Sequence, residues 1–271
     1  MALDAFYLDT PAGQCLCLHH APPKDSLVHG TVVYVPPFAE EMNKSRRMAA
    51  LQAQALARAG YAVLQLDLYG TGDSAGDFAD ANWNAWLQDL ARACDWLGEH
   101  YPGQERWLWG LRTGCLLAAA AAAGQAEPVH LLLWQPVFSG KQFLQQFLRL
   151  KSAGDMLTGE SRGENPREQL ARGESVEVAG YTLSPALAAG LEQAELVPDG
   201  RGRVVVVEIS SRTEPGLSPA TASRLEKWRA AGLAAEGLPV NGPSFWQTTE
   251  IETIATLCEV SLMALGEQVA A

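Results

Sequence analysis

Residues 107–114 have the sequence Trp-Leu-Trp-Gly-Leu-Arg-Thr-Gly, with Gly110 two positions before Arg112 and Gly114 two positions after it. The apolar first half predicts a buried β-strand, and the alanine-rich stretch that follows, up to Ala123, predicts a helix. Glycines on both sides of the central residue favour a sharp turn, because larger side chains would collide there. A Gly-x-x-x-Gly spacing alone also fits a plain helix start with close packing, so the rest of the chain has to decide.

The chain on either side of this segment alternates between short apolar strands and helices. A Pro-Ala-Gly turn between 6–8 and 14–18 predicts an N-terminal hairpin. Further strands are predicted at 31–35, 61–66, 106–109, 129–134, 203–209 and 234–239, and helices at 48–59, 83–97, 112–123, 219–231 and 250–265. This order predicts the α/β class, with a mostly parallel eight-stranded sheet and helices on both faces.

The alternation breaks between Ser139 and Pro198. This part of the chain contains a polar stretch around 154–174 and a predicted helix at 185–196. We expect a lid or cap insertion at 139–198, between the sixth and seventh strands of a single domain that covers residues 1–271. Ligands of open parallel sheets bind at the carboxyl ends of the strands, so functional residues are expected on the strand-to-helix loops.

The composition excludes several classes of protein. Apolar residues make up 48% of the chain, and 20 Lys and Arg stand against 31 Asp and Glu, a net charge of -11. A globular core is therefore expected, whereas binding to nucleic acid or to anionic membranes is not. The five cysteines match no zinc spacing, and no apolar run approaches the ~20 residues of a transmembrane segment. We expect a cytoplasmic protein with no signal peptide, metal or cofactor.

Two further motifs follow predicted strands. The loop at 36–46 comes after the third strand, and 66–74, Leu-Asp-Leu-Tyr-Gly-Thr-Gly-Asp-Ser, comes after the fourth. Together with the glycines around Arg112, these motifs resemble the α/β-hydrolase superfamily. That resemblance implies an α/β-hydrolase fold, in which the first loop supplies an oxyanion-hole amide and the Gly-x-Ser-x-Gly turn presents the nucleophile.

A narrower resemblance rests on four segments: 36–47, 109–114, 179–184 and 242–251. They are similar to the type 2 exosortase A system-associated hydrolases. The resemblance covers nearly the whole chain. It implies a link to bacterial exopolysaccharide and PEP-CTERM protein-sorting systems, but no specific activity.

The residues of a serine hydrolase are missing at two positions. Arg112 replaces the serine nucleophile, and a guanidinium is permanently protonated and cannot attack a carbonyl. The five histidines are His19, His20, His29, His100 and His130, so none follows the last strand, where 240–246 takes the place of the base. Glu214 is a possible relic of the acid. Losing serine or histidine alone costs a serine protease roughly a million-fold in kcat, so ordinary esterase activity is predicted to be absent.

Three other residues could carry chemistry but have structural explanations. We expect Cys115 in the core, because it lies inside the predicted helix with no histidine predicted nearby. Ser74 is expected to form hydrogen bonds within its turn. Trp246 fits a pocket wall and a core position equally well.

Arg112 needs an anion, because it places a fixed positive charge at a helix N-terminus. One explanation is an internal ion pair with a nearby glutamate, since an unpaired buried guanidinium costs several kcal/mol. The candidates are Glu40, Glu41, Glu208 and Glu214. The other explanation is the carboxylate or phosphate of a ligand, which arginine binds in bidentate fashion. The two are not exclusive.

These observations lead to three hypotheses. The first is a pseudo-hydrolase with a binding or accessory role in envelope polysaccharide or protein sorting. Its ligand would be an anionic small molecule or an acyl compound or glycoconjugate, and its partner a protein of such a system. The expected binding residues are Phe38, Ala39, Glu40, Asn43, Arg112, Thr113, Glu214 and Trp246. The second is a hydrolase or transferase in which Glu40 or Glu41 activates water and Arg112 stabilises the oxyanion. The third is an interaction protein with a filled pocket.

Overall fold

A computed structural model describes residues 2–158 and 164–266 of the chain. Its centre is an eight-stranded sheet in the order β1-β2-β4-β3-β5-β6-β9-β10. Strand β2 runs antiparallel to both of its neighbours, β1 and β4, and the other neighbouring strands pair in parallel. The strands are β1 (Ala2–Asp9), β2 (Gln14–Ala21), β3 (Gly30–Val35), β4 (Tyr61–Leu66), β5 (Arg106–Leu111), β6 (His130–Trp134), β9 (Val204–Ser210) and β10 (Ala235–Asn241). The predicted hairpin and mostly parallel sheet are confirmed.

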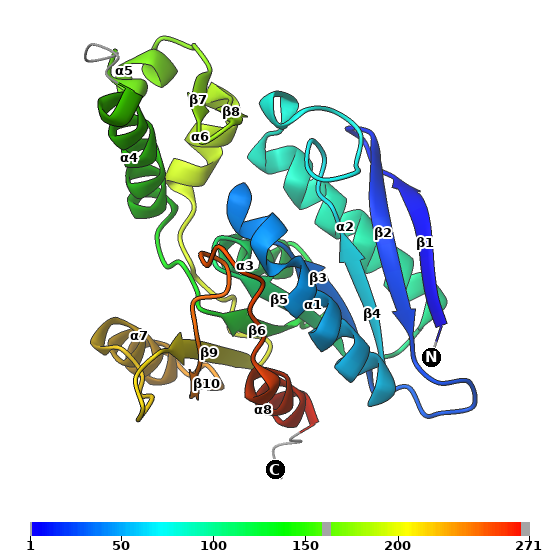
Figure 1. Cartoon of the computed structure of the whole chain (residues 1–271). Helices are drawn as coiled ribbons and strands as arrows, with labels where there is room; N and C mark the ends of the chain where they lie inside the picture. Colours follow the sequence, from blue (N-terminus) through cyan, green and yellow to red (C-terminus); the bar gives the residue numbers. More distant parts are fainter. Residues whose placement is uncertain (1, 159–163, 267–271) are drawn as a thin grey trace.

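Helices cover both faces of the sheet (Figure 1). Helices α2 and α3 pack with α7 on one face, and α1 and α8 pack on the other. The helices are α1 (Glu40–Arg58), α2 (Trp83–His100), α3 (Gly114–Ala123), α7 (Pro219–Ala230) and α8 (Ala255–Gly266), and a short 3-10 helix, η1 (Phe78–Asp80), precedes α2. Within the described residues, no helix combines the length and hydrophobicity needed to cross a membrane.

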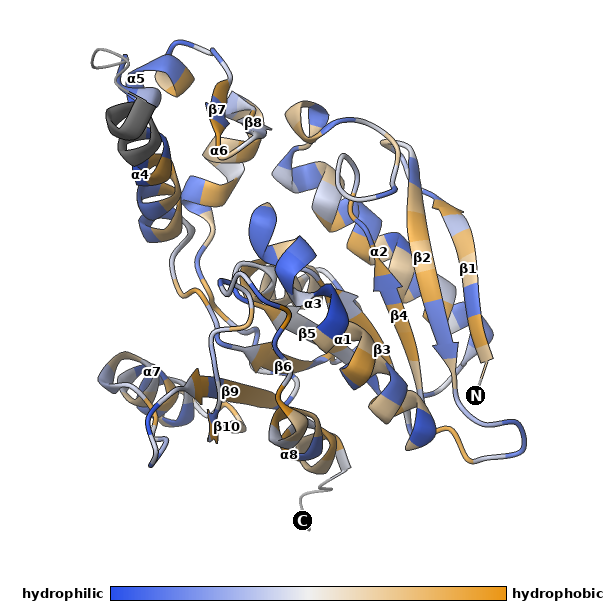
Figure 2. Cartoon of the chain, in the orientation of Figure 1, coloured by the Kyte–Doolittle hydropathy of each residue, from blue (hydrophilic) through white to orange (hydrophobic). Residues whose placement is uncertain are grey.

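The alternation of side chains along the strands builds two separate cores. In β3, Val33 and Val35 belong to the core beneath α2 and α3, whereas Val32 and Tyr34 belong to the core beneath α1 and α8. Successive side chains of a strand point to opposite faces, so a strand covered on both sides is apolar throughout. Figure 2 shows this for β9, while the first turns of α1 are hydrophilic.

The segment between β6 and β9 forms its own small group of elements, set apart from the sheet in Figure 1. It contains α4 (Gly140–Thr158), α5 (Pro166–Ala171), β7 (Val176–Val178), β8 (Tyr181–Leu183) and α6 (Pro185–Gln193). The hydroxyl of Ser184 donates to the Ala81 carbonyl at 2.9 Å and ties this insertion to the main body. Residues 159–163 of the predicted insertion, and 267–271 of the predicted domain, lie outside the described residues.

The largest difference from the sequence prediction lies in the insertion, where only the helix at 185–196 is predicted and α4, α5, β7 and β8 are additional. The second difference is the start of α1. A helix was predicted from residue 48, but α1 begins at Glu40, so only 36–39 remain a loop. The first two turns expose charged side chains, which hides the apolar periodicity, although Met42, Ser45 and Met48 form a buried stripe. At the other end of the chain, α8 begins at Ala255 rather than at residue 250.

Candidate functional site

The turn between β5 and α3 has the sharp geometry that its two glycines predict. Arg112 has a φ of 55°, which is unusual for a residue with a side chain and costs on the order of 1 kcal/mol. A Cβ on Gly114 would lie 2.3 Å from the Val35 carbonyl oxygen, and one on Gly110 would lie 2.7 Å from the backbone of Cys115. The Arg112 N–H donates to the Trp134 carbonyl at 3.0 Å, which fixes the turn against β6.

The Arg112 side chain forms an ion pair with Glu41 in the first turn of α1. Its Nε lies 3.3 Å from Glu41 Oε1, and the side chains are only 17% and 7% exposed. The guanidinium carbon lies 5.5 Å from the centre of the Trp246 ring, which adds a cation–π contact. Of the four glutamates considered as internal partners, Glu41 is the one that fills the role. Glu208 instead accepts the Ser218 N–H at 3.0 Å.

The Glu41 carboxyl group is buried in surroundings that disfavour its charged form. Burial raises its pKa, and the adjacent Arg112 charge opposes that shift only in part. Its Oε2 is buried and has no hydrogen-bond partner among the described residues, and neither does Oε2 of Glu40. A buried carboxylate oxygen without a donor favours the protonated form or a donor that arrives from elsewhere.

The loop between β3 and α1 closes over the turn from the other side. Ala39 has a φ of 53° and precedes the first residue of α1. Phe38 is buried edge-to-face among aromatic rings, two of which, Phe143 and Phe147, come from α4 of the insertion. The cavity that remains beside Thr113 measures about 10 Å³, which barely holds one water. Side chains therefore fill the space in front of the turn.

The remaining members of a catalytic triad have no counterpart around Arg112. His19 pairs with Tyr101, His20 pairs with Gln65, and His130 accepts the Arg203 N–H, so each of these rings has a partner away from Arg112. After β10, where a histidine base would stand, Trp246 is 3% exposed, so the structure places it in the core. Glu214 is exposed on the loop before α7.

The structural explanations for Cys115 and Ser74 are confirmed. Cys115 is fully buried, its thiol donates to the Trp134 carbonyl, and burial raises the pKa of that thiol. The hydroxyl of Ser74 accepts the Leu16 N–H at 2.9 Å and donates to the Asp67 carbonyl at 2.6 Å. Neither group is poised as a nucleophile. Among the residues that the structure describes, no cluster of His, Cys, Asp and Glu is arranged to bind a metal ion.

Comparison with known families places these features in context. A sequence profile of the family described as serine aminopeptidase, S33, matches residues 27–162, about half of the chain. The chain belongs to this family. It is thereby a member of the α/β-hydrolase superfamily.

Solved structures agree with the fold of this family member. Est1E from Butyrivibrio proteoclasticus, solved with ferulic acid, superposes with a TM-score of 0.71 at 16% identity, over 98% of this chain and 100% of that one. XC6422 from Xanthomonas campestris, described as a serine hydrolase without a lid, gives 0.59 at 17% identity, over 98% and 94%. An α/β serine hydrolase homologue from Coxiella burnetii gives 0.58 at 16%, over 98% of both chains. Curated protein sequences give no match.

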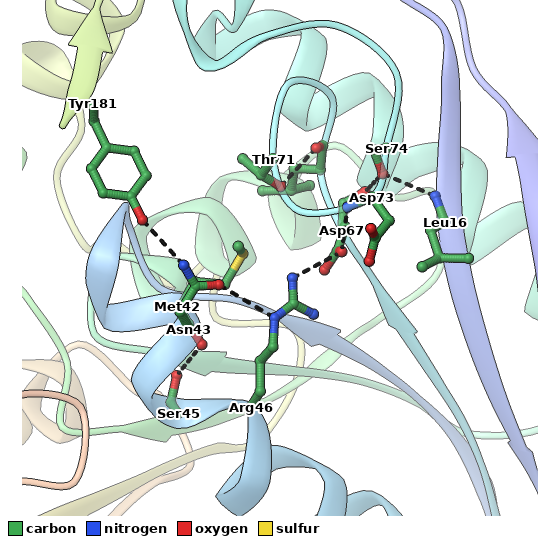
Figure 3. Close-up of polar contacts among 11 residues, drawn as sticks. Leu16, Met42, Asn43, Ser45, Arg46, Asp67, Thr71, Asp73, Ser74 and Tyr181 are labelled. Carbon is green, nitrogen blue, oxygen red and sulfur yellow. Dashed lines mark hydrogen bonds and ion pairs between the residues drawn. The ribbon is translucent and has the colours of Figure 1, made fainter. Parts of the chain in front are cut away.

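This member of the S33 family has a further opening beside the first turns of α1. A polar cleft of about 500 Å³ lies between the first turns of α1, the loop after β4 and Tyr181 of the insertion (Figure 3). The predicted residues Ala39 and Asn43 line it, and Asn43 Nδ2 donates to the Tyr181 hydroxyl at 3.2 Å. Arg46 and Asp73 also line it and were missed, because the motif at 66–74 was used only to assign the fold.

Proposed function

We propose that this protein is a non-catalytic member of the α/β-hydrolase superfamily with a ligand-binding or accessory role. The observation that carries this proposal is the buried ion pair between Arg112 and Glu41 at the position of the nucleophile. A guanidinium cannot form an acyl-enzyme, and the ion pair occupies the space that an ester carbonyl would need. Residues 1–271 then act as one domain, with 139–198 as a lid over the loop that holds Phe38.

The resemblance of four segments to the type 2 exosortase A system-associated hydrolases supports a biological setting. We place the protein with a PEP-CTERM sorting or exopolysaccharide system, in the cytoplasm, with a protein of such a system as partner. Affinity purification of the tagged protein from cells that contain these components tests this setting. Recovery of an exosortase-system or polysaccharide-synthesis protein supports this setting. If no protein of either kind is recovered, the setting is contradicted.

Hydrolysis assays test the loss of catalysis. The native protein is assayed with a panel of aryl esters and acyl thioesters, beside Arg112→Ala and an active serine esterase as positive control. We expect turnover at the level of buffer for both, and no labelling of the native protein by a fluorophosphonate probe. Turnover in the native protein that is lost in Arg112→Ala would contradict the proposal.

A reconstruction variant makes the test sharper. Arg112→Ser restores a Gly-x-Ser-x-Gly turn but supplies no histidine base. We expect Arg112→Ser to remain inactive and unlabelled, because a serine without a base is a weak nucleophile. Strong labelling of this variant would show that another group in the protein can act as the base.

A second candidate function is favoured by the Glu41 carboxyl group. Its raised pKa and its unpartnered Oε2 are properties of a general base that could activate water, with Arg112 as an oxyanion or anion anchor. Such an enzyme would act on an acyl or glycoconjugate substrate. Its rate would rise with pH as Glu41 ionises, and Glu41→Gln would abolish turnover. A flat pH profile, or full activity in Glu41→Gln, would exclude it.

A further inference from the structure

Two adjoining cavities lie outside the turn that holds Arg112, and they share Met42 and Arg46 of α1 as a common wall. The first is the polar cleft described above. The second is a cavity of about 200 Å³ beneath α1, between that helix and strands β2, β3 and β4. Together they offer far more space than the gap of about 10 Å³ beside Thr113.

The cavity beneath α1 is apolar over most of its wall. Its lining residues are Leu16, Leu18, Tyr34, Pro36, Met42, Ala49, Ala50 and Leu66, with Gln65, Arg46 and Asp67 at its polar positions. Gln65 is already hydrogen-bonded to His20 at 2.8 Å. An apolar cavity of roughly 150 Å³ is large enough for a benzene ring, so this one holds an aryl group or a short alkyl chain.

A polar contact lies at the boundary between the two cavities. Arg46 Nη2 lies 3.0 Å from Asp67 Oδ2, and the same oxygen accepts the Asp73 N–H at 3.1 Å (Figure 3). Gly72 makes this contact possible, since a Cβ there would lie 1.9 Å from Asp67 Oδ2. The Asp67 side chain is only 9% exposed, whereas the Arg46 side chain is 42% exposed, so Asp67 is the buried partner and Arg46 reaches it from the surface.

The charges around the polar cleft argue against an anionic ligand. The Arg46 charge is matched by Asp67, which leaves the exposed Asp73 carboxylate in the lining, and Glu40 acts electrostatically on Tyr181. The lining of the polar cleft therefore presents more hydrogen-bond acceptor oxygens than positive charges without an ion-pair partner. Carboxylate, threonine and tyrosine oxygens bind hydroxyl groups well, and the rings of Phe78 and Tyr181 offer apolar surface beside them.

We propose that the two cavities form one binding site for an uncharged amphipathic molecule, with a polyhydroxylated head in the polar cleft and an aryl or short alkyl or acyl tail in the apolar cavity. A volume of about 500 Å³ for the head is in the range of small-molecule sites. The hydrogen bond between Asn43 and Tyr181 places the insertion over the head. This site deepens the binding role proposed above and lies apart from Arg112.

Isothermal titration calorimetry with defined probes tests the site. The probes are hexyl glucoside and monohexanoylglycerol, each below its micelle concentration, with glucose, glycerol and hexanoate for comparison. We expect at least one hexyl polyol to bind about tenfold or more tightly than its tail-free head and than hexanoate. The tighter of the two indicates whether the head is a sugar or a glycerol.

Matched variants locate the binding. Ala50→Leu fills the apolar cavity from α1 and is expected to weaken hexyl polyol binding by about tenfold. Ala55→Leu, at a half-buried position of the same helix outside the cavity, is the control and should leave binding unchanged. Asp73→Asn should weaken the polyol probes and strengthen hexanoate, because it removes the unmatched negative charge.

Three outcomes would overturn the proposal: no binding of either hexyl polyol, equal binding of hexanoate, or unchanged binding in Ala50→Leu. Thermal melting of each variant shows whether it is folded. The binding measurement does not depend on turnover, so the two proposals can fail separately. Esterase activity would contradict the proposed loss of catalysis but not this binding site. Failure of the hexyl polyols to bind would contradict the binding site but not the loss of catalysis.

Discussion

Glu41 and Arg112 stand 71 residues apart in the chain and meet as a buried ion pair, with Nε 3.3 Å from Oε1. The pair joins the first turn of α1 to the turn between β5 and α3. Arg112 thus stands at the turn that presents the nucleophile in active α/β-hydrolases, and Glu41 follows the loop that supplies an oxyanion-hole amide in them. A buried ion pair is by itself weak evidence of a stabilising interaction. Removal of one partner nevertheless destabilises the fold strongly, because the other charge stays buried without a counter-ion.

Removal of one partner is therefore expected to cost more than removal of both. Glu41→Leu should lower the free energy of unfolding by about 3 kcal/mol, because it leaves the Arg112 charge buried without a partner. The double variant Glu41→Leu with Arg112→Met should recover most of that loss. Urea unfolding of the two single variants and the double variant measures the coupling. Additive effects would show that the pair does not act as a unit.

The glycine after Arg112 is expected to be indispensable for the turn. Gly114→Ala should lower stability by about 2 kcal/mol or more, because its Cβ would collide with the Val35 and Pro36 carbonyl oxygens. Gly124→Ala at the end of α3 is the matched control, since its Cβ would meet its nearest atom at 3.5 Å. Thermal melting compares the two, and equal melting temperatures would contradict the steric argument.

Asp89 of α2 should give stability a pH dependence. Its Oδ2 accepts the Tyr69 N–H at 2.9 Å, its Oδ1 is buried without a partner, and burial raises its pKa. A raised pKa in the folded state means that unfolding releases a proton, so this group lowers stability as pH rises through the window above its unfolded pKa. Asp89→Asn cannot ionise.

The expected result is that Asp89→Asn gains stability relative to the native protein as pH rises from about 4, the unfolded pKa of an aspartate, through the raised pKa of Asp89 in the fold. Urea unfolding of both proteins across that range measures the difference. A difference that shrinks with rising pH would mean that the Asp89 carboxylate is stabilised in the fold.

Chemical labelling should separate one cysteine from the other four. Burial raises the pKa of the Cys15, Cys17 and Cys94 thiols to about 12, and Cys115 is fully buried. Cys258 is only half-buried, with its pKa raised to about 11. Because the thiolate is the reactive form, maleimide at neutral pH should modify Cys258 slowly and the others only after unfolding. Mass spectrometry of native, Cys258→Ser and urea-treated protein checks this order, and early labelling of Cys115 would contradict it.

Much of the fold follows from local sequence pattern. The strand β4 matches its predicted range of 61–66, and the ends of β3, β5 and β9 differ from prediction by a residue or two. Continuous apolar runs bounded by Gly, Asp or charged residues leave little choice for where a strand begins and ends. The start of α1 was missed, because Asn43, Lys44 and Arg46 give its first turns a loop-like composition, while Met42 and Ser45 become buried only against the sheet.

The sequence by itself determined that Arg112 stands at the turn and that no histidine follows the last strand. Both facts depend only on which residue occupies a position in the chain, and not on contacts with distant segments. Only the tertiary structure decided which glutamate pairs with Arg112, that Trp246 lies in the core, and that Arg46 lines two adjoining cavities. These outcomes depend on how α1, the loop after β4 and the insertion pack together. Side chains far apart in the chain meet there, and local periodicity carries no information about such contacts.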